Sequence, residues 1–241
     1  MPFFPEATEA LIFDLDGTLY DQGRLRRKMF LDLMVGLAKN PLFLQKINVL
    51  YTFRKNRERL SAGTGDACCI ERRQYAEVAH ALGLSIVDVR RIVNEWIFEK
   101  PLKHLAQCVY PGVNDLFTIL KQKKYKIGIF SDYPCHSKLQ SLELKVDAMV
   151  CATDEQVDRF KPHPAGLLFT AKELGVPAMN CFFIGDRDDK DGECARRAGM
   201  SFLILPRGQI SIIDWYQEAI MQMRRMDRAI DSPRAMQCSN T

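Results

Sequence analysis

The sequence lacks any long apolar run and any strong excess of one charge. Its longest apolar runs fall far short of the roughly 20 residues that a membrane-spanning helix needs. The formal charge of +4 is small beside 34 basic and 30 acidic residues, which argues against nucleic acid or a membrane surface as a partner. A soluble protein is therefore expected, and a small anionic ligand is compatible with this charge.

Cysteine is present but follows no pattern. The eight cysteines are scattered, lack the paired spacing of zinc ligands and follow no secretory signal. We therefore expect reduced thiols and a cytoplasmic location. The 241 residues suit one large domain, or a core with a smaller second domain.

Short apolar segments and helical segments alternate along the chain beyond residue 109. Such alternation predicts an α/β fold with a parallel sheet and crossover helices. The expected strands are residues 9–13, 126–130, 147–151, 181–184 and 202–205. The expected helices between them are residues 114–122, 137–142, 165–174 and 193–198, the last two ended by Gly175 and Gly199.

Residues 21–108 show helical spacing and no convincing strand. Leu25, Met29, Leu33 and Leu37 recur at four-residue steps, as on one face of a helix. Two glycines predict a loop at residues 61–66. We therefore expect an all-helical domain of residues 21–108 inserted into a core of residues 1–20 and 109–207. Residues 208–241 are expected to form a helix at 210–230 that packs on the core, followed by a disordered tail.

Polar side chains gather where the predicted strands end. Asp14 and Asp16 follow the first strand, and residues two apart in a strand point to the same side. Ligands of open parallel sheets bind beyond the carboxyl ends of the strands, so polar residues at the other strand ends belong to the same expected site. These are Ser131 and Asp132 after the second strand, Lys161 in the loop after the third, and Asp186, Asp188, Asp189 and Asp191 after the fourth.

This set of side chains suits phosphoryl transfer. A carboxylate such as Asp14 can attack phosphorus to give an aspartyl-phosphate, while Mg²⁺ bridged by carboxylates neutralises charge on the phosphate. Asp16 could protonate the leaving oxygen and then deprotonate the attacking water. The Ser131 hydroxyl, backbone N–H groups and the Lys161 ammonium would hold the phosphoryl oxygens.

Four motifs, in this order along the chain, resemble those of the haloacid dehalogenase superfamily of hydrolases. They are DLDGT at residues 14–18, Ser131 after an apolar strand, Lys161 before a proline, and GD at residues 185–186 followed by Asp191. The resemblance covers about residues 8–20 and 109–207. It implies a Rossmann-like parallel sheet, with Asp14 as nucleophile and Asp16 as general acid and base. An acid at position 16 is typical of the phosphatases in this superfamily.

The resemblance also implies a metal site and a substrate site. Mg²⁺ would be held by Asp14, the backbone carbonyl of Asp16 and Asp186. Among the later acids, Asp191 is favoured over Asp188 and Asp189 as the further carboxylate of the metal site. The substrate would be bound by Thr18, Ser131, Asp132 and Lys161.

The helical insertion at residues 21–108 lies where the superfamily carries a helical cap, and this arrangement is similar to the phosphoglycolate phosphatase group. A cap excludes water and selects the substrate. Its candidate contacts for a second anionic group are Arg24, Arg26, Arg27, Arg72 and Arg73, although a solvent-exposed helix face is the favoured interpretation for most of them. The expected function is hydrolysis of a small phosphomonoester, either phosphoglycolate-like or sugar-phosphate-like. The alternatives are a phosphotransferase or phosphomutase of the same superfamily and a non-catalytic regulatory module. No oligomeric state is predicted.

Overall fold

A five-stranded parallel sheet forms the centre of the protein, whose computed structural model describes residues 4–40, 43–62, 69–206 and 208–231. The strands are β1 (Ala10–Phe13), β2 (Lys126–Ser131), β3 (Ala148–Cys151), β4 (Cys181–Gly185) and β5 (Ser201–Ile204). Their order is β3-β2-β1-β4-β5, and every pairing is parallel. Because β2 and β4 flank β1 on opposite sides, the strand order reverses at β1. Open α/β sheets bind their ligands at such a point.

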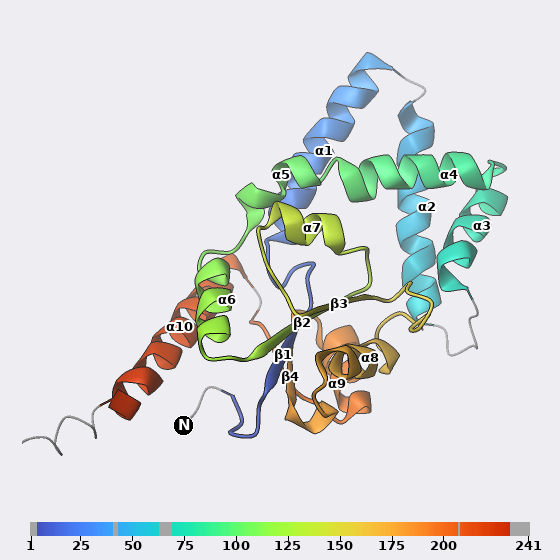
Figure 1. Ribbon diagram of the computed structural model, residues 1–241. Coiled ribbons are helices and arrows are strands. Elements are labelled where there is room, and N and C mark those ends of the chain that lie inside the picture. The colour runs from blue at the N-terminus through green and yellow to red at the C-terminus, as the bar shows by residue number, and fades with distance from the viewer. Residues whose placement is uncertain (1–3, 41–42, 63–68, 207, 232–241) are drawn as a thin grey trace, which may run out of the picture.

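Helices cover both faces of the sheet (Figure 1). The flanking helices are α6 (Val113–Gln122) and α10 (Gln209–Asp231) on one face, and α8 (Ala165–Leu174) and α9 (Glu193–Ala198) on the other. Leu11 and Phe13 of β1 belong to the hydrophobic cluster with α6 and α10, whereas Ala10 and Ile12 belong to the cluster with α8 and α9. All four residues of β1 are fully buried, as is typical of a parallel strand covered on both faces.

The C-terminal helix packs on the core, as predicted. α10 buries Trp215 and Tyr216 among other side chains and contacts α6. The tail that was expected to be disordered, residues 232–241, lies outside the described residues. The remaining short elements of the core are α7 (His136–Ser141), the 3-10 turn η3 (Ala178–Asn180) and the π-helical turn η4 (Asp188–Gly192). None of the described helices has both the length and the apolar character that crossing a bilayer requires.

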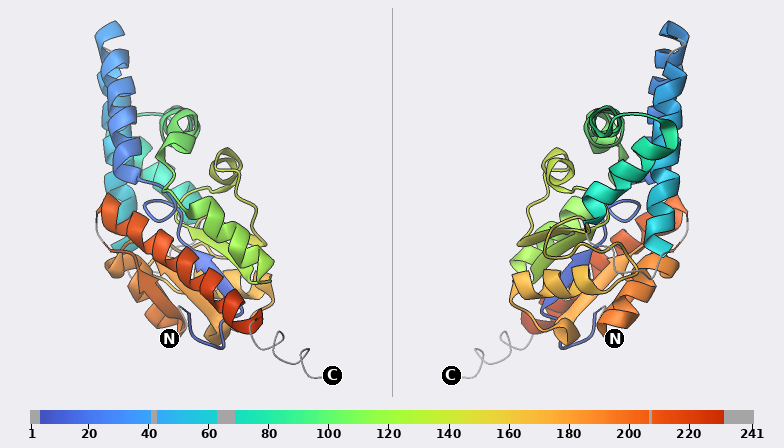
Figure 2. Two further views of the ribbon diagram at one scale, coloured as in Figure 1. Left: turned by 90° about the vertical axis from the view of Figure 1, so that its left-hand side faces the viewer. Right: turned by 90° about the vertical axis from the view of Figure 1, so that its right-hand side faces the viewer.

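A helical cap lies beyond the carboxyl ends of the strands (Figure 1). Its elements are α1 (Gln22–Lys39), α2 (Phe43–Ala62), α3 (Ile70–Leu82), α4 (Ile86–Val93), the π-helical η1 (Asn94–Glu99), α5 (Leu102–Leu105) and the 3-10 turn η2 (Ala106–Cys108). α1 and α2 pack side by side and project farthest from the sheet (Figure 2). The two chain segments that join the cap to the core run together, since Asp21 N donates to Cys108 O at 2.8 Å.

Local sequence explains where several helices begin and end. The side chain of Asp21 accepts from Arg24 N at the start of α1, which satisfies a free N–H of the first turn. Gly175 and Gly199 end α8 and α9 in the left-handed conformation, as predicted. The loop predicted at residues 61–66 begins too early. Ser61 and Ala62 still belong to α2, where the Ser61 hydroxyl donates to Lys161 O in the core. Residues 63–66 lie outside the described residues.

Candidate active site

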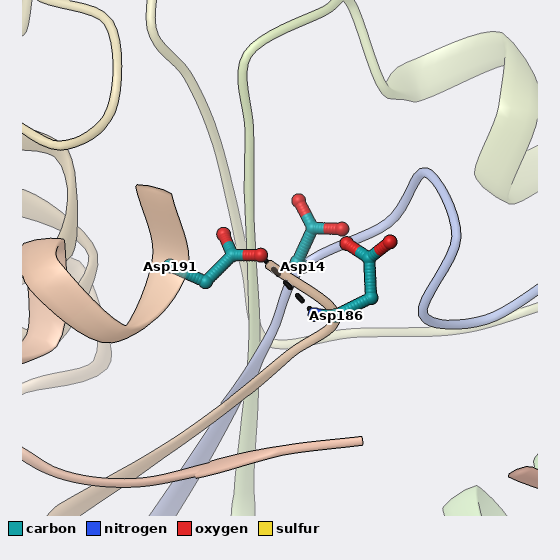
Figure 3. A group of neighbouring side chains, drawn as sticks. All are labelled: Asp14, Asp186 and Asp191. Atoms are coloured by element: carbon teal, nitrogen blue, oxygen red, sulfur yellow. Dashed lines mark hydrogen bonds between the residues drawn. The ribbon is translucent and has the colours of Figure 1, made fainter. Parts of the chain in front are cut away.

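Three carboxylates converge beyond the carboxyl ends of β1 and β4. Asp14 follows β1, Asp186 follows β4, and Asp191 comes from η4. One oxygen from each lies within 4.8 Å of the others, and Asp186 N donates to Asp191 Oδ2 at 3.1 Å (Figure 3). The register of the sheet pairs Phe13 with Ile184. The strands themselves therefore bring Asp14 and Asp186 side by side.

Two glycines permit this close approach. Gly17 has a φ of +107°, and a Cβ on it would lie 2.5 Å from Asp186 Oδ2. A Cβ on Gly185 would lie 2.5 Å from the Cβ of Asp191. A side chain at either position would push the carboxylates apart, and the positive φ at Gly17 favours glycine in any case. The DLDGT motif therefore encodes a tight turn as well as two acids.

The acids of η4 separate into one buried residue and two exposed ones. Asp191 is 3% exposed and belongs to the group of three carboxylates. Asp188 pairs with Arg196 at 2.6 Å, and Asp189 pairs with Arg187 at 2.7 Å. Asp191 is thus the acid of this turn that lies beside Asp14.

Lys161 is the buried cation of the site. Its side chain is 2% exposed, and its Nζ lies 2.6 Å from Asp14 Oδ1 and 2.8 Å from Asp191 Oδ1. Burial alone would lower the pKa of Lys161, but the carboxylates of Asp14 and Asp191 hold that pKa well above its ordinary value. The ammonium is therefore charged, and it contacts one carboxylate oxygen of Asp14 and one of Asp191.

The carboxylates outnumber this ammonium. Burial, followed by repulsion from Asp191 and Asp186, raises the pKa of Asp14 well above its ordinary value, although Lys161 acts in the opposite direction. Burial and the neighbouring Asp191 likewise raise the pKa of Asp186 to about 6. Crowded carboxylates of this kind are stabilised by a bound cation, and hard oxygen donors suit Mg²⁺. The donor set therefore fits a divalent metal ion.

Of the other expected substrate-binding residues, Thr18 contacts Asp14, and Ser131 and Asp132 line the same cavity as Asp14. Thr18 is fully buried, and its Oγ1 donates to Asp14 Oδ2 at 3.1 Å. Ser131, also buried, accepts from Tyr133 N at 3.2 Å. Asp132 Oδ1 accepts from the backbone N–H of Lys161 at 3.1 Å. The carboxylate of Asp132 therefore ties together the two loops that carry Ser131 and Lys161.

The carboxylate of Asp16 stands apart from the group of three. Its Oδ1 accepts from Lys138 Nζ at 2.5 Å and from the Tyr20 hydroxyl. Burial would raise the pKa of Asp16, but the charge and hydrogen bond of Lys138, together with the Tyr20 hydrogen bond, lower it. Oδ2 is buried and has no hydrogen-bond partner among the described residues. Asp16 is therefore ionised, and only one of its oxygens is hydrogen-bonded to residues that the structure describes.

Two buried basic residues near the site are not predicted from the sequence. Lys138 of α7 is 7% exposed, and Arg57 of α2 is 6% exposed. Arg57 donates to Asp132 O at 2.5 Å and to Gln74 Oε1 at 2.6 Å. Both residues lie in helical segments rich in polar side chains, where a basic residue is typical of a solvent-exposed face. No motif distinguishes them, so only their tertiary contacts identify them.

A cavity of about 900 Å³ lies between the core and the cap. Of the five cap arginines considered as substrate contacts, Arg26 and Arg27 line it. Arg24, Arg72 and Arg73 do not, and Arg73 instead pairs with Glu77 within the cap at 2.8 Å. The cavity reaches the core at Asp14, Asp16, Ser131, Asp132, Lys161, Asp186 and Asp191.

Comparison with known proteins gives curated relatives that cover most of the chain. A phosphoglycolate phosphatase of Pseudomonas fluorescens (strain Pf0-1) is 23% identical over 209 residues, which cover 85% of this chain and 72% of that protein. An N-acetylmuramic acid 6-phosphate phosphatase of Pseudomonas aeruginosa is 25% identical over 238 residues, which cover 92% of this chain and 96% of that protein.

Solved structures share the fold. A HAD phosphatase from Thermococcus onnurineus gives a TM-score of 0.54 at 20% identity, covering 83% of this chain and 87% of that one. CbbY from Rhodobacter sphaeroides, solved in complex with phosphate, also gives 0.54, at 19% identity, covering 84% of this chain and 88% of that one. The family model for haloacid dehalogenase-like hydrolases matches residues 8–199. The chain therefore belongs to the haloacid dehalogenase-like hydrolases, a family of enzymes built on a Rossmann-type sheet.

Proposed function

We propose that the protein is a Mg²⁺-dependent phosphatase that hydrolyses a small phosphomonoester through an aspartyl-phosphate on Asp14. The surroundings of Asp14 carry this proposal, since Lys161 Nζ lies 2.6 Å from one of its oxygens and two further carboxylates lie beside it. This carboxylate has a cation to hold the transferred group and donors for a metal ion. Relatives named as phosphatases of phosphoglycolate and of N-acetylmuramic acid 6-phosphate support a phosphorylated metabolite as the substrate.

In the first half of the proposed reaction, an oxygen of Asp14 attacks phosphorus and the bond to the leaving oxygen breaks. The negative charge of the phosphate disfavours the ionised form of Asp16, which then holds a proton at its unpartnered Oδ2. Asp16 gives that proton to the leaving oxygen. Lys161 and the Ser131 hydroxyl hold the phosphoryl oxygens as their charge changes.

In the second half, water attacks phosphorus and the bond to Asp14 breaks. Asp16 takes the proton of the water, and inorganic phosphate leaves as the Asp14 carboxylate is restored. Mg²⁺ would be held by Asp14, the backbone carbonyl of Asp16 and Asp186, with Asp191 beside them, and when bound it supplies charge neutralisation for the phosphoryl group.

The alternatives receive less support from the site. A phosphotransferase or phosphomutase would need an acid–base group in the cap that serves a second hydroxyl. Neither His80 nor His104 lines the cavity, and His104 hydrogen bonds to Asp32 at 2.9 Å. Burying charged side chains costs free energy, and a regulatory module without activity would not require the buried charges of this site. Hydrolysis is therefore the function that the site supports best.

Two substitutions test the proposal. Asp14→Asn should abolish turnover of 4-nitrophenyl phosphate in Mg²⁺, because no carboxylate remains to attack phosphorus. Asp16→Asn should still bind metal and still form the intermediate with this good leaving group. In the proposed mechanism the side chain of residue 16 only transfers the proton and does not bind the metal. Asp115→Asn, on the exposed side of α6, serves as a control. Substantial turnover by a correctly folded Asp14→Asn would contradict the mechanism. Equal loss of metal affinity in both variants would contradict the division of roles.

A further inference from the structure

The cavity is much larger than a phosphoglycolate site requires. Its volume is about 900 Å³, and it extends from the catalytic side chains to α1, α2 and η1 of the cap. Pockets of roughly 300–1,000 Å³ hold drug-sized molecules. The two-carbon acid of phosphoglycolate would leave most of this space unfilled. The volume therefore indicates a substrate with a larger alcohol portion.

Several apolar side chains line the cap side of this cavity, and we name this set the apolar cap wall. Its members are Leu25, Met29 and Leu33 of α1, Leu50 of α2, and Trp96 and Ile97 of η1. The three residues of α1 lie at four-residue steps and so share one helix face. Leu25, Met29, Leu50 and Trp96 are each at most 8% exposed, and the Trp96 ring packs edge-on against Phe43 at 5.0 Å. The wall is therefore held in place before any ligand binds.

The apolar cap wall has almost no hydrogen-bond donors or acceptors for the hydroxyl groups of a sugar. Its side chains are hydrocarbon or thioether apart from the indole of Trp96, and Trp96 Nε1 is covered by neighbouring atoms. A hydroxyl group buried without a hydrogen-bond partner costs free energy, whereas apolar surface buried there gains it. The wall therefore favours an alcohol portion made of hydrocarbon.

Cations lie at the exposed side of the same cavity. Arg26 and Arg27 of α1 and Arg54 of α2 line it, are exposed, and form no ion pair with any residue that the structure describes. Unpaired cations at an entrance attract an anionic ligand from solution. The cavity thus combines a phosphate site, the apolar cap wall and a cationic entrance, which is the complement of an amphipathic phosphomonoester.

We infer that the enzyme prefers phosphomonoesters whose alcohol portion is an apolar chain or ring that packs on the apolar cap wall. This inference rests on the proposed phosphatase function and adds a substrate class to it. Each methylene group that the wall buries should raise kcat/KM by roughly fourfold until the wall is covered. Phosphoglycolate and hydroxyl-rich sugar phosphates gain nothing from this surface.

A chain-length series tests the inference. Phosphate release from butyl, hexyl and octyl phosphate, all below micelle-forming concentrations, is measured beside phosphoglycolate and glucose 6-phosphate in Mg²⁺. We expect kcat/KM to rise by at least about tenfold from butyl to octyl phosphate and octyl phosphate to exceed both metabolites. A flat or falling series, with 4-nitrophenyl phosphate still turned over, would overturn the substrate class alone. No turnover of 4-nitrophenyl phosphate would overturn the phosphatase function and this inference with it.

A matched pair of variants on α1 locates the effect. Leu33→Gln places a polar group in the apolar cap wall at almost constant volume, so the octyl-to-butyl ratio of kcat/KM should fall several-fold. Leu37 lies one turn further along the same helix and packs against the same cluster, but it does not line the cavity. Leu37→Gln should leave the ratio as in the parent enzyme. A ratio that responds equally to both substitutions, or to neither, would contradict the role of the wall.

Discussion

Two buried lysines form ion pairs with different carboxylates of the site. Lys161, with a side chain 2% exposed, contacts Asp14 and Asp191. Lys138, with a side chain 9% exposed, contacts Asp16. A buried charge that loses its partner is left uncompensated, so each lysine constrains the carboxylates beside it. At the scale of single residues, the proposed nucleophile Asp14 and the proposed proton carrier Asp16 thus contact different lysines.

Lys138 should therefore act on the reaction through Asp16. In Lys138→Met the Asp16 carboxylate loses its strongest contact, and proton transfer to the leaving oxygen should suffer. We expect kcat/KM for an alkyl phosphate to fall by about 10- to 100-fold. The value for 4-nitrophenyl phosphate should fall much less, since nitrophenolate leaves without a proton. The exposed Lys145 just beyond α7, changed to Met, is the control. Equal losses for the two substrates would rule out action through Asp16.

The sequence predicts the site residues that lie at strand ends. It does not predict those that tertiary packing brings to the site. Asp14, Ser131 and Asp186 lie at the carboxyl ends of neighbouring parallel strands. These ends share one edge of the sheet, so the proximity of the three residues follows from the order of the strands. Lys138 reaches Asp16 from 122 residues away along the chain. Its burial depends on how α7 packs beside the DLDGT turn, which no spacing of residues expresses.

At the scale of elements, α2 connects the cap to three loops of the core. Arg57 donates to Asp132 O after β2 and lies 3.9 Å from the centre of the Tyr133 ring. The Ser61 hydroxyl donates to Lys161 O in the loop after β3. Glu58 pairs with Lys190 of η4 at 2.8 Å. One cap helix thus supports the loops that carry Ser131, Lys161 and Asp191.

Arg57 should be the strongest of these connections. Arg57→Met leaves Asp132 O without its buried donor, so we expect a loss of about 1–3 kcal/mol of unfolding free energy and a lower kcat. Arg57→Lys should recover part of both. Arg59→Met on the same helix removes contacts only to Asn56 and Glu77 within the cap and should cost at most about 1 kcal/mol. Urea unfolding and steady-state kinetics measure both quantities. A kcat that stays at the parent value in Arg57→Met would contradict a supporting role for α2.

The elements of the core are predictable, and their contacts with the cap are not. All five expected strands are confirmed within one residue at each end, because most of the apolar runs are bounded by polar, Gly or Pro residues. The prediction of a loop at residues 61–66 was wrong at Ser61, which belongs to α2. The Ser61 hydroxyl donates to Lys161 O in the core, a contact that nearby sequence does not indicate. The proposed boundaries of the helical insertion stay a prediction.

At the scale of the whole molecule, the group of three carboxylates should make stability depend on a metal ion. Mg²⁺ bound among Asp14, Asp186 and Asp191 would relieve their repulsion, and a ligand that binds only the folded state adds about 2.7 kcal/mol when its concentration is 100 times Kd. After chelation, Mg²⁺ should therefore raise the thermal midpoint and restore activity. Asp186→Asn should lose most of this shift. Asp189→Asn, at an exposed position, should keep the Mg²⁺-induced rise in the thermal midpoint. Equal loss of this rise in both variants would contradict metal binding by Asp186.

The cavity belongs to this scale too, because core and cap build it jointly. No sequence pattern predicts its volume or its apolar wall, since both depend on how α1, α2 and η1 are placed above the sheet. The family resemblance predicts that the cap excludes water and selects the substrate. The amphipathic substrate class that we infer depends on the assembled structure, because the wall is formed by several elements of the cap.

The central claim is that the phosphoryl group is transferred to the Asp14 carboxylate before water releases it. Trapping this aspartyl-phosphate tests the claim most directly. Asp16→Asn is mixed with 4-nitrophenyl phosphate and Mg²⁺, quenched, and treated with borohydride, which reduces an acyl phosphate to an alcohol. The account predicts homoserine at position 14 in the peptide mass spectrum and none in Asp14→Asn. Homoserine at another aspartate, or none at any position while 4-nitrophenol is released, would contradict it.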